Sequence, residues 1–310
     1  MDFSPDELTA AVCQLAIECG FVRAAVASAG ELGGCEKFDD WLARGWHGDM
    51  DYMAANVEKR KRPSLLVPGA ASVLVLAVSY APGGDDSAPS EPGYIARFAR
   101  GRDYHKVLKR RCITLMDRLR QIAPDFDGRA FVDTAPVMER SLAAASGLGW
   151  IGRNGCLIAG ELGSYVLLCE IISNLPLTPG RAVESACGDC DACIRACPTG
   201  ALGQDGLVDS TKCLSYLTIE HRGAVAEELL KSNRGLYGCD LCQEACPHNR
   251  DIPAGDPELT TWSGPEIELD AVASWTLDDW DQATRGRAIR RAKYEMFLRN
   301  AAAAGAYRGR

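Results

Sequence analysis

The chain has 310 residues, 47% of them hydrophobic and 25% charged, and its formal net charge at pH 7 is −8. A chain of this length can form one large domain and a smaller one, and its acidic balance argues against nucleic-acid binding by the surface as a whole. The longest apolar stretches, residues 73–78 and 165–169, are far too short to span a membrane, and the acidic N-terminus lacks a secretory or twin-arginine signal. We therefore expect a cytoplasmic protein without a membrane span.

The first 176 residues mix helical and strand patterns. A capping box at Ser4 and Glu7, with Pro5 at the first helical position, marks the start of the first helix. Helices are predicted over residues 5–19, 38–44, 51–56, 103–122 and 137–146, and strands over residues 21–27, 73–79, 129–133, 157–159 and 164–172, of which the last two form a hairpin. Residues 83–92, rich in Gly, Pro, Ser and Asp, are predicted to form a surface loop. Because these elements follow no regular βαβ period, we expect an α+β domain with a central sheet.

Eight of the fourteen cysteines follow a spacing that is typical of iron–sulfur proteins. The bacterial pattern C-x2-C-x2-C-x3-C-P is complete at Cys187, Cys190, Cys193, Cys197 and Pro198, and its second half recurs, after a lone Cys213, at Cys239, Cys242, Cys246 and Pro247. Eight thiols can hold two 4Fe–4S clusters. Residues 177–253 are therefore predicted to form a bacterial ferredoxin-like domain.

The same spacing predicts which thiols share a cluster, because in such runs the cysteine before the proline binds the other cluster. One predicted set is Cys187, Cys190, Cys193 and Cys246, and the other is Cys213, Cys239, Cys242 and Cys197. Two zinc sites are a weaker alternative, since zinc prefers two C-x2-C pairs with a loop between them. Disulfides are weaker still in a reducing compartment. The other six cysteines have apolar neighbours and are interpreted as reduced core residues: Cys13, Cys19, Cys35, Cys112, Cys156 and Cys169.

Residues 254–310 are predicted to be a helical C-terminal segment with a basic end. Eight Lys and Arg residues lie between residues 281 and 310, against Asp281 and Glu295. Two shorter basic runs lie at residues 59–62 and 109–111. Such patches either hold a phosphate backbone or are solvated helix faces, and the sequence leaves both interpretations open.

Residues 147–152 match G-x-G-x-x-G, the pattern of dinucleotide-binding loops. That loop must follow a strand and open a helix, whereas here it follows a predicted helix and precedes a strand. A nucleotide site is therefore rejected. We expect these glycines to let the backbone approach a cofactor or another strand closely.

Several motifs resemble those of the epoxyqueuosine reductase family. They are Asp-Thr-Ala-Pro within residues 132–140, the glycine-rich stretch at residues 147–154, and residues 213–220, 237–240 and 285–293. The resemblance covers nearly the whole chain, with the motifs in the family's order. Longer relatives carry an additional C-terminal helical-repeat domain, and this chain stops after the basic segment, which becomes a candidate for tRNA contacts.

The resemblance implies an oxidoreductase that uses cobalamin and two 4Fe–4S clusters to reduce epoxyqueuosine to queuosine at the tRNA wobble position, the last step of queuosine synthesis. Residues 1–176 would bind cobalamin. The implied partners are tRNA and a separate reductant or electron-donor protein, and we expect a monomer. The implied catalytic acid is Asp133, and the implied cofactor-binding residues are Arg60, Tyr104, His105, Asp133, Gly149, Trp150, Ile151, Gly152, Asn154, Ser215, Asp240, Leu241 and Gln243.

Removal of an epoxide oxygen requires a proton donor, and the acid role therefore predicts that Asp133 is protonated near neutral pH. Burial away from cations would raise its pKa in that way, and Arg140 would oppose the shift if it pointed inward. The alternative is a structural one, in which Asp133 caps the helix that follows Pro136.

Two other classes of function compete with this interpretation. A reductive dehalogenase also uses two clusters and cobalamin, but such enzymes typically carry a twin-arginine signal. A plain electron carrier would not need so large an N-terminal domain or the motif at Asp133.

Overall fold

A four-stranded antiparallel sheet forms the centre of the first half of the chain, in a computed structural model that describes residues 3–83, 92–261 and 267–308. Its strand order is β1 (Arg23–Ser28), β2 (Ser72–Ser79), β7 (Val166–Ser173) and β4 (Gly128–Phe131). All eight residues of β2 are buried, because β2 pairs on both sides and both faces of the sheet are covered. The expected mixed α and β architecture is confirmed.

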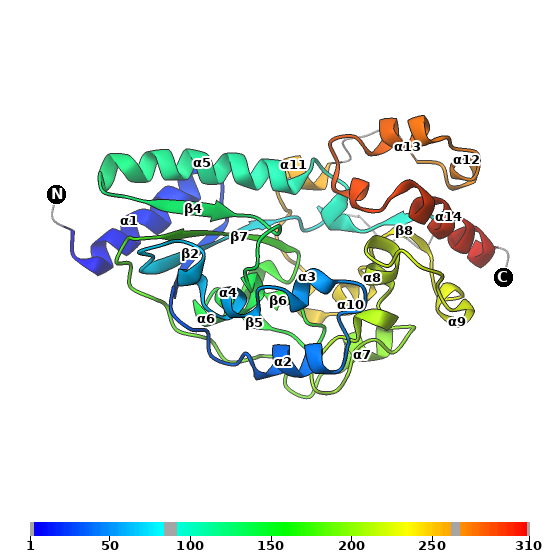
Figure 1. The fold of residues 1–310 in the computed structure, drawn as a ribbon, viewed down its shortest axis with the longest axis horizontal. Coiled ribbons are helices and arrows are strands. Elements are labelled where there is room, and N and C mark those ends of the chain that lie inside the picture. The colour runs from blue at the N-terminus through cyan, green and yellow to red at the C-terminus, as the bar shows by residue number, and fades with distance from the viewer. Residues whose placement is uncertain (1–2, 84–91, 262–266, 309–310) are drawn as a thin grey trace.

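Alternate residues of β2 face two different hydrophobic layers. Leu74 and Leu76 pack in the layer that contains α1 (Pro5–Glu18) and α5 (Tyr104–Ile122). Val73 and Val75 face the layer of α6 (Glu139–Ala145) on the other side. Figure 1 shows α1 and α5 along one side of the sheet and α6 on the opposite side. The capping box at Ser4, predicted for the first helix, is present.

Short elements complete the structure. They are α2 (Glu36–Ala43), α3 (Asp51–Ala54), α4 (Val57–Lys61), β3 (Tyr94–Ile95), β5 (Trp150–Ile151), β6 (Leu157–Ile158), α7 (Ala192–Ala196), α8 (Leu214–Ile219), α9 (Glu227–Leu230), β8 (Gly235–Tyr237), α10 (Leu241–Glu244), α11 (Pro257–Thr260), α12 (Leu269–Val272), α13 (Leu277–Thr284) and α14 (Tyr294–Arg308). The cysteine-rich segment lies beside the sheet, and α12 to α14 extend beyond α5 (Figure 1). No helix of the described residues is both long and apolar enough to cross a membrane.

The C-terminal segment shares the main hydrophobic core. Ile289 and Phe297 are fully buried in the same cluster as Leu108 and Leu115 of α5. The short strand β3 pairs in parallel with β8, which joins the first half of the chain to the cysteine-rich segment. The three parts of the chain therefore pack against one another over continuous apolar contacts.

Two sequence predictions of local structure are wrong. The hairpin of residues 157–159 and 164–172 does not form, because β6 pairs with β5 while β7 pairs with β2 and β4. The helix predicted over residues 51–56 ends two residues early, at Ala54 as α3, and α4 begins only at Val57, after Asn56 in the left-handed region at φ 57°. Most of the surface loop predicted over residues 83–92 lies outside the described residues.

Candidate active site and iron–sulfur centres

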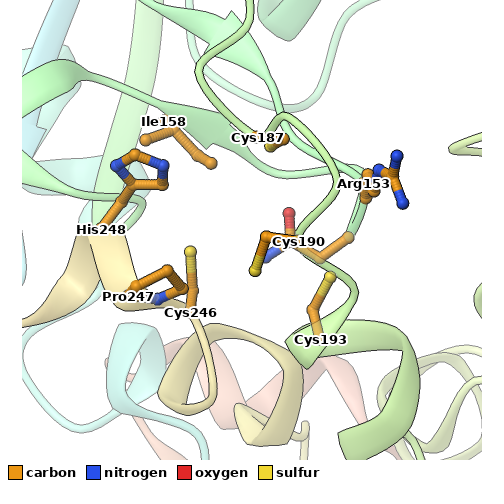
Figure 2. Close-up of a pocket in the computed structure, with 9 residues that line it drawn as sticks. Arg153, Ile158, Cys187, Cys190, Cys193, Cys246, Pro247 and His248 are labelled. Carbon is orange, nitrogen blue, oxygen red and sulfur yellow. The ribbon is translucent and has the colours of Figure 1, made fainter.

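Four of the predicted ligand thiols surround one cavity of about 300 Å³. Cys187, Cys190 and Cys193 come from the first cysteine run and Cys246 from the second, and Figure 2 shows the four side chains around a common space. This is the grouping predicted from the spacing. Cys190 is exposed, so this side of the cavity lies at the molecular surface.

The remaining four thiols form a second group, none of whose members is exposed. Cys213 and Cys197 are among the electrostatic neighbours of Cys239, and Cys239 and Cys213 are among those of Cys242. Burial is the main cause that raises the pKa of Cys239, and the neighbouring thiols raise this pKa further. The structure thus brings together both predicted sets of four.

A ninth thiol, Cys156, lies within hydrogen-bonding reach of Cys242. We interpreted Cys156 as an ordinary core cysteine, and its position beside a predicted cluster ligand was missed. No spacing rule connects residues 156 and 242, since they meet only through the packing of the β5–β6 loop against α10.

The thiols of the first set line a common space and do not converge on a single metal position. Within the parts of the chain that the structure describes, no group of three or more His, Cys, Asp or Glu side chains is placed to hold a single metal ion. Four thiols that line a common space without converging on one point suit a cluster of iron and sulfide better than one tetrahedral zinc ion, whose four ligands converge at about 2.3 Å.

A separate polar cluster is centred on Asp133, after the end of β4. Its Oδ2 accepts a hydrogen bond from the Tyr104 hydroxyl at 2.5 Å and lies 3.2 Å from Nε2 of His105. Nδ1 of His105 lies 2.8 Å from Asp103, the N-cap residue of α5. The rings of Tyr104 and His105 stack with centroids 4.0 Å apart. The first two residues of α5, Tyr104 and His105, therefore both contact the same carboxylate oxygen of Asp133.

The backbone of Asp133 is strained. Its φ is 55°, in the left-handed region that residues with a Cβ rarely adopt. The alternative role as a helix cap is wrong, because α6 begins at Glu139, its N-cap is Met138, and no side chain caps it. Such strain is typical of functional positions rather than of ordinary turns.

The hydrogen bonds decide where the protons of this cluster reside. Burial raises the pKa of Asp133, but the hydrogen bonds from His105 and Tyr104 outweigh burial and lower it. Burial lowers the pKa of His105, and its hydrogen bonds to Asp103 and Asp133 raise it to about 9. At neutral pH the proton is therefore on the imidazolium of His105, which donates to both carboxylates.

The raised pKa that we expected for Asp133 is contradicted, and the physical reason is His105, 28 residues away in the sequence. Arg140 does not cause the shift, since its guanidinium donates to the carbonyl oxygen of Gly155. Half of the Asp133 side chain remains exposed, at 54%. The carboxylate is thus charged, oriented and accessible.

The expected cofactor-binding residues divide into several groups. Asn154 and Ile158 line the cavity of Cys187, and Trp150 packs edge-on against His248 of the same cavity. Trp150 Nε1 and Asn154 Nδ2 are buried and have no hydrogen-bond partner among the described residues. These two donors are therefore available to a bound group beside the first set of thiols.

The glycines of this loop make close backbone contacts. A Cβ on Gly149 would lie 2.1 Å from the carbonyl oxygen of Ile158, and one on Gly152 would lie 2.8 Å from the Ile158 side chain. The loop leads into β5, so the rejection of a nucleotide-binding loop is confirmed. The partner that these glycines approach is strand β6. Ile151, between them, is 41% exposed.

Other expected residues have internal partners. Arg60 is buried and donates to the carbonyl oxygen of Tyr52 at 2.7 Å. Asp240 accepts from the Tyr94 hydroxyl and from the backbone N–H of Arg97, and burial raises its pKa. Gln243 donates to the carbonyl oxygen of Ser164 at 3.0 Å. These contacts give Arg60, Asp240 and Gln243 structural roles in the fold.

Leu241 and Ser215 lie near the second set of thiols. Leu241 lines a cavity of about 420 Å³ together with Cys239 and Asp240. Ser215 is half-buried in α8, two residues after Cys213. The structure does not bring either residue into hydrogen-bonding contact with Asp133.

Much of the basic C-terminal segment is occupied by internal contacts. Arg285 and Arg290 both pair with Asp281, and Arg291 makes a two-point contact with Glu220 at 2.9 and 2.7 Å. Arg299 donates to backbone carbonyl oxygens of residues 217, 221 and 223. Most of these arginines therefore stabilise the fold. Arg291 also lies 5.9 Å from the ring of Tyr52, which is 46% exposed.

Comparison with known proteins places the chain in a family. Residues 60–134 match the family described as epoxyqueuosine reductase QueG, and residues 186–249 match the 4Fe-4S double cluster binding domain. The chain is 40% identical over 308 residues to an epoxyqueuosine reductase of Pseudomonas aeruginosa, covering 96% of this chain and 85% of the relative. It is 38% identical over 307 residues to that of Escherichia coli, covering 96% and 81%.

Solved structures agree with this assignment. A selenomethionine-labelled epoxyqueuosine reductase superposes with a TM-score of 0.87 at 28% identity, over 97% of this chain and 81% of the other. An epoxyqueuosine reductase with an epoxyqueuosine-modified tRNA-Tyr stem loop superposes with a TM-score of 0.85 over the same shares. On its sequence identity and coverage, the chain belongs to the epoxyqueuosine reductase family.

Proposed function

We propose that this protein reduces the epoxide of epoxyqueuosine in tRNA to give queuosine, with two 4Fe–4S clusters and cobalamin as cofactors. The observation that carries the proposal is the combination of an oriented, half-exposed carboxylate at Asp133 with two sets of four thiols, in a chain of this family. The reaction consumes two electrons and two protons and releases the epoxide oxygen as water, leaving an alkene.

The proposed cluster ligands are the two thiol sets described above. Clusters transfer electrons one at a time, and the exposure of Cys190 favours entry of electrons from a separate reductant at the first set. None of the four thiols of the second set is exposed. Electrons would pass from the set with the exposed Cys190 to this second set.

Cobalamin is the proposed partner of the Asp133 cluster. The cluster offers hydrogen-bonding groups at a partly exposed surface and, among the described residues, no set of three metal ligands, which suits a cofactor that carries its own ligands for cobalt. Tyr104, His105, Asp133 and Ser215 would hold it. When bound, cobalamin supplies a strongly nucleophilic centre that stores two electrons.

The chain's own residues supply the first of the two protons, and water supplies the second. His105 holds the first proton at Nε2, 3.2 Å from Oδ2 of Asp133. Transfer from Nε2 to Oδ2 protonates the carboxylate, which then donates to the departing epoxide oxygen as general acid. Tyr104 keeps the carboxylate oriented during the transfer by its hydrogen bond of 2.5 Å.

The proposed substrate is a nucleoside in a single-stranded anticodon loop, as in the stem-loop complex of the solved relative. Such loops are bound through stacked bases and phosphate contacts. The exposed ring of Tyr52 beside the guanidinium of Arg291 suits a stacked base. We keep residues 1–176, 177–253 and 254–310 as the proposed cofactor, cluster and C-terminal units, and a cytoplasmic monomer as the proposed state.

The experiment that tests the proposal is an anaerobic turnover assay. The protein is reconstituted with iron, sulfide and cobalamin, mixed with a strong reductant and epoxyqueuosine-bearing tRNA, and the nucleosides are identified by mass spectrometry. Queuosine that forms only with cobalamin is the expected result. No queuosine from protein with verified iron and cobalt would contradict the proposal.

A further inference from the structure

Two glutamates lie directly behind Asp133. Glu139 is the first residue of α6, and its Oε1 accepts the backbone N–H of Asp133 at 2.7 Å. Glu170 lies in the middle of β7, where it is paired with Val75 of β2 and Phe131 of β4, and it is 0% exposed. Neither residue has a part in the chemistry described above.

The surroundings of Glu170 do not suit a charged carboxylate. Leu168 and Ile172, which share its face of β7, belong to the apolar layer under α6. Both of its carboxyl oxygens are buried without a hydrogen-bond partner among the described residues. An ion is not stable in such a layer unless it is paired, so Glu170 is expected to be neutral.

Glu139 is the polar group within hydrogen-bonding reach of Glu170. Two ionised carboxylates cannot bond to each other, because neither has a donor. One proton between them converts the contact into a hydrogen bond. Glu170 then donates to one side of the Glu139 carboxyl while Oε1 of Glu139 accepts from Asp133.

We propose that Glu139 and Glu170 share a proton as a buried acid pair, and that this pair positions Asp133 by holding Glu139 as the acceptor for its backbone N–H. The contact is made to the one residue of the site with a left-handed backbone, at φ 55°. The inference rests on the proposed function, because its consequence is the orientation of the carboxylate during epoxide reduction.

The charges around the pair agree with this arrangement. Asp133, His105 and Arg140 are the charged neighbours of Glu139, while Cys112 of α5 lies across the sheet from Glu170, against Cys169. Burial and the charge of Asp133 raise the pKa of Glu139 to about 8, and burial and Glu139 raise that of Glu170 further. Both shifts favour the protonated form, so the pair holds at least one proton at neutral pH.

The first test separates positioning from proton donation by two substitutions at one residue. Glu139→Gln keeps an acceptor oxygen but has no titrating proton, whereas Glu139→Ala removes the acceptor. In the reconstituted holoenzyme we expect Glu139→Ala to lower kcat by about tenfold with KM for a tRNA stem loop unchanged, and Glu139→Gln to restore kcat to within about threefold. Glu161→Gln, at an exposed glutamate, is the matched control.

Equal losses in Glu139→Gln and Glu139→Ala would overturn the positioning role, since they would make the proton of Glu139 essential. Full activity of Glu139→Ala would overturn it as well. Iron content, cobalt content and Tm are recorded for each variant, so that a loss of cofactor is distinguished from a loss of positioning.

The second test does not depend on turnover. Infrared difference spectra of the holoenzyme at pH 7 should contain the C=O band of a buried, protonated carboxyl that disappears in Glu170→Gln and persists in Glu161→Gln. No difference between wild type and Glu170→Gln would overturn the acid pair even in an active enzyme. If the protein proves inactive on epoxyqueuosine, this band still decides whether the pair shares a proton.

Discussion

The cysteine-rich segment and the Asp133 cluster are encoded in different ways. The thiols of the first cavity come from two short runs whose spacing predicts their grouping, and Cys246 joins Cys187, Cys190 and Cys193 as expected. The Asp133 cluster instead combines the start of α5, a loop after β4 and the start of α6. The difference teaches that the grouping of these thiols follows local spacing, whereas the charge state of Asp133 depends on residues brought together by the fold.

The largest expected effect tests the Asp133 cluster alone. Asp133→Asn keeps the size of the side chain but cannot accept the proton of His105 as a carboxylate, so turnover should fall by a factor of about 10² to 10⁴. Iron should remain bound, because Asp133 is not among the thiol sets, and cobalt should remain bound because Tyr104, His105 and Ser215 would still hold cobalamin. Asp117→Asn, at an exposed aspartate of α5, is the control. Near-normal activity of Asp133→Asn would show that the acid lies elsewhere.

The next largest effect tests the grouping of the thiols. Cys246→Ala and Cys197→Ala should each lose about four of about eight iron atoms, because each removes one ligand of a different cluster. The double variant Cys246→Ala/Cys190→Ala should lose no more iron than Cys246→Ala alone, whereas Cys246→Ala/Cys197→Ala should lose both clusters. Iron analysis and electron paramagnetic resonance measure this. Loss of both clusters in the first double variant would contradict the grouping.

The sequence predicted the central sheet, its long helices and both thiol sets because each depends on a pattern within one stretch of chain. β2 and β7 were found within two residues of their observed ends, since buried strands are continuous apolar runs. The hairpin at residue 160 was wrong because two neighbouring apolar runs do not reveal which strand each will pair with. Cys156 and Glu170 were missed for the same reason, as their partners are distant in sequence.

The protonation of Asp133 could not be predicted from sequence at all. Nothing in residues 132–140 indicates that His105 will lie 3.2 Å from the carboxylate. Burial alone predicts a raised pKa, and the hydrogen bonds from His105 and Tyr104 reverse the direction. The motif therefore identifies the residue, and the fold determines which member of the cluster carries the proton.

A prediction with a smaller expected effect concerns the pH dependence of kcat. The pKa of His105 is raised in the folded protein to about 9, so the ring is protonated below that pH and loses its proton as pH rises through it. Wild-type kcat should fall on the alkaline side near pH 9. In His105→Gln, Asp133 loses the interaction that lowers its pKa and must carry the proton itself, so the fall should begin at lower pH.

The control for this prediction is His221→Gln, because the ring of His221 contacts Asp49 and the carbonyl oxygen of Ala224 instead of Asp133. The pH profile of that variant should match wild type. An unchanged alkaline limb in His105→Gln would show that His105 does not supply the proton.

The smallest effect tests whether the first cluster site depends on cysteine spacing alone. Gly149→Ala changes no cysteine, but its Cβ would lie 2.1 Å from the carbonyl oxygen of Ile158, a residue that lines the Cys187 cavity. The backbone must shift, at a cost of about 1–3 kcal/mol of unfolding free energy. Gly33→Ala, where nothing lies within 4 Å of the added Cβ, should change stability by less than about 0.5 kcal/mol. If Gly149→Ala lowers Tm and also speeds loss of iron from the first cluster, then the residues of the first half of the chain that line this cavity, such as Asn154 and Ile158, help the thiols to retain the cluster. If Tm falls while iron is retained as in wild type, the thiols and their spacing are sufficient to hold the first cluster. Cluster retention in the cysteine-rich segment would then not depend on the stability of the first half of the chain.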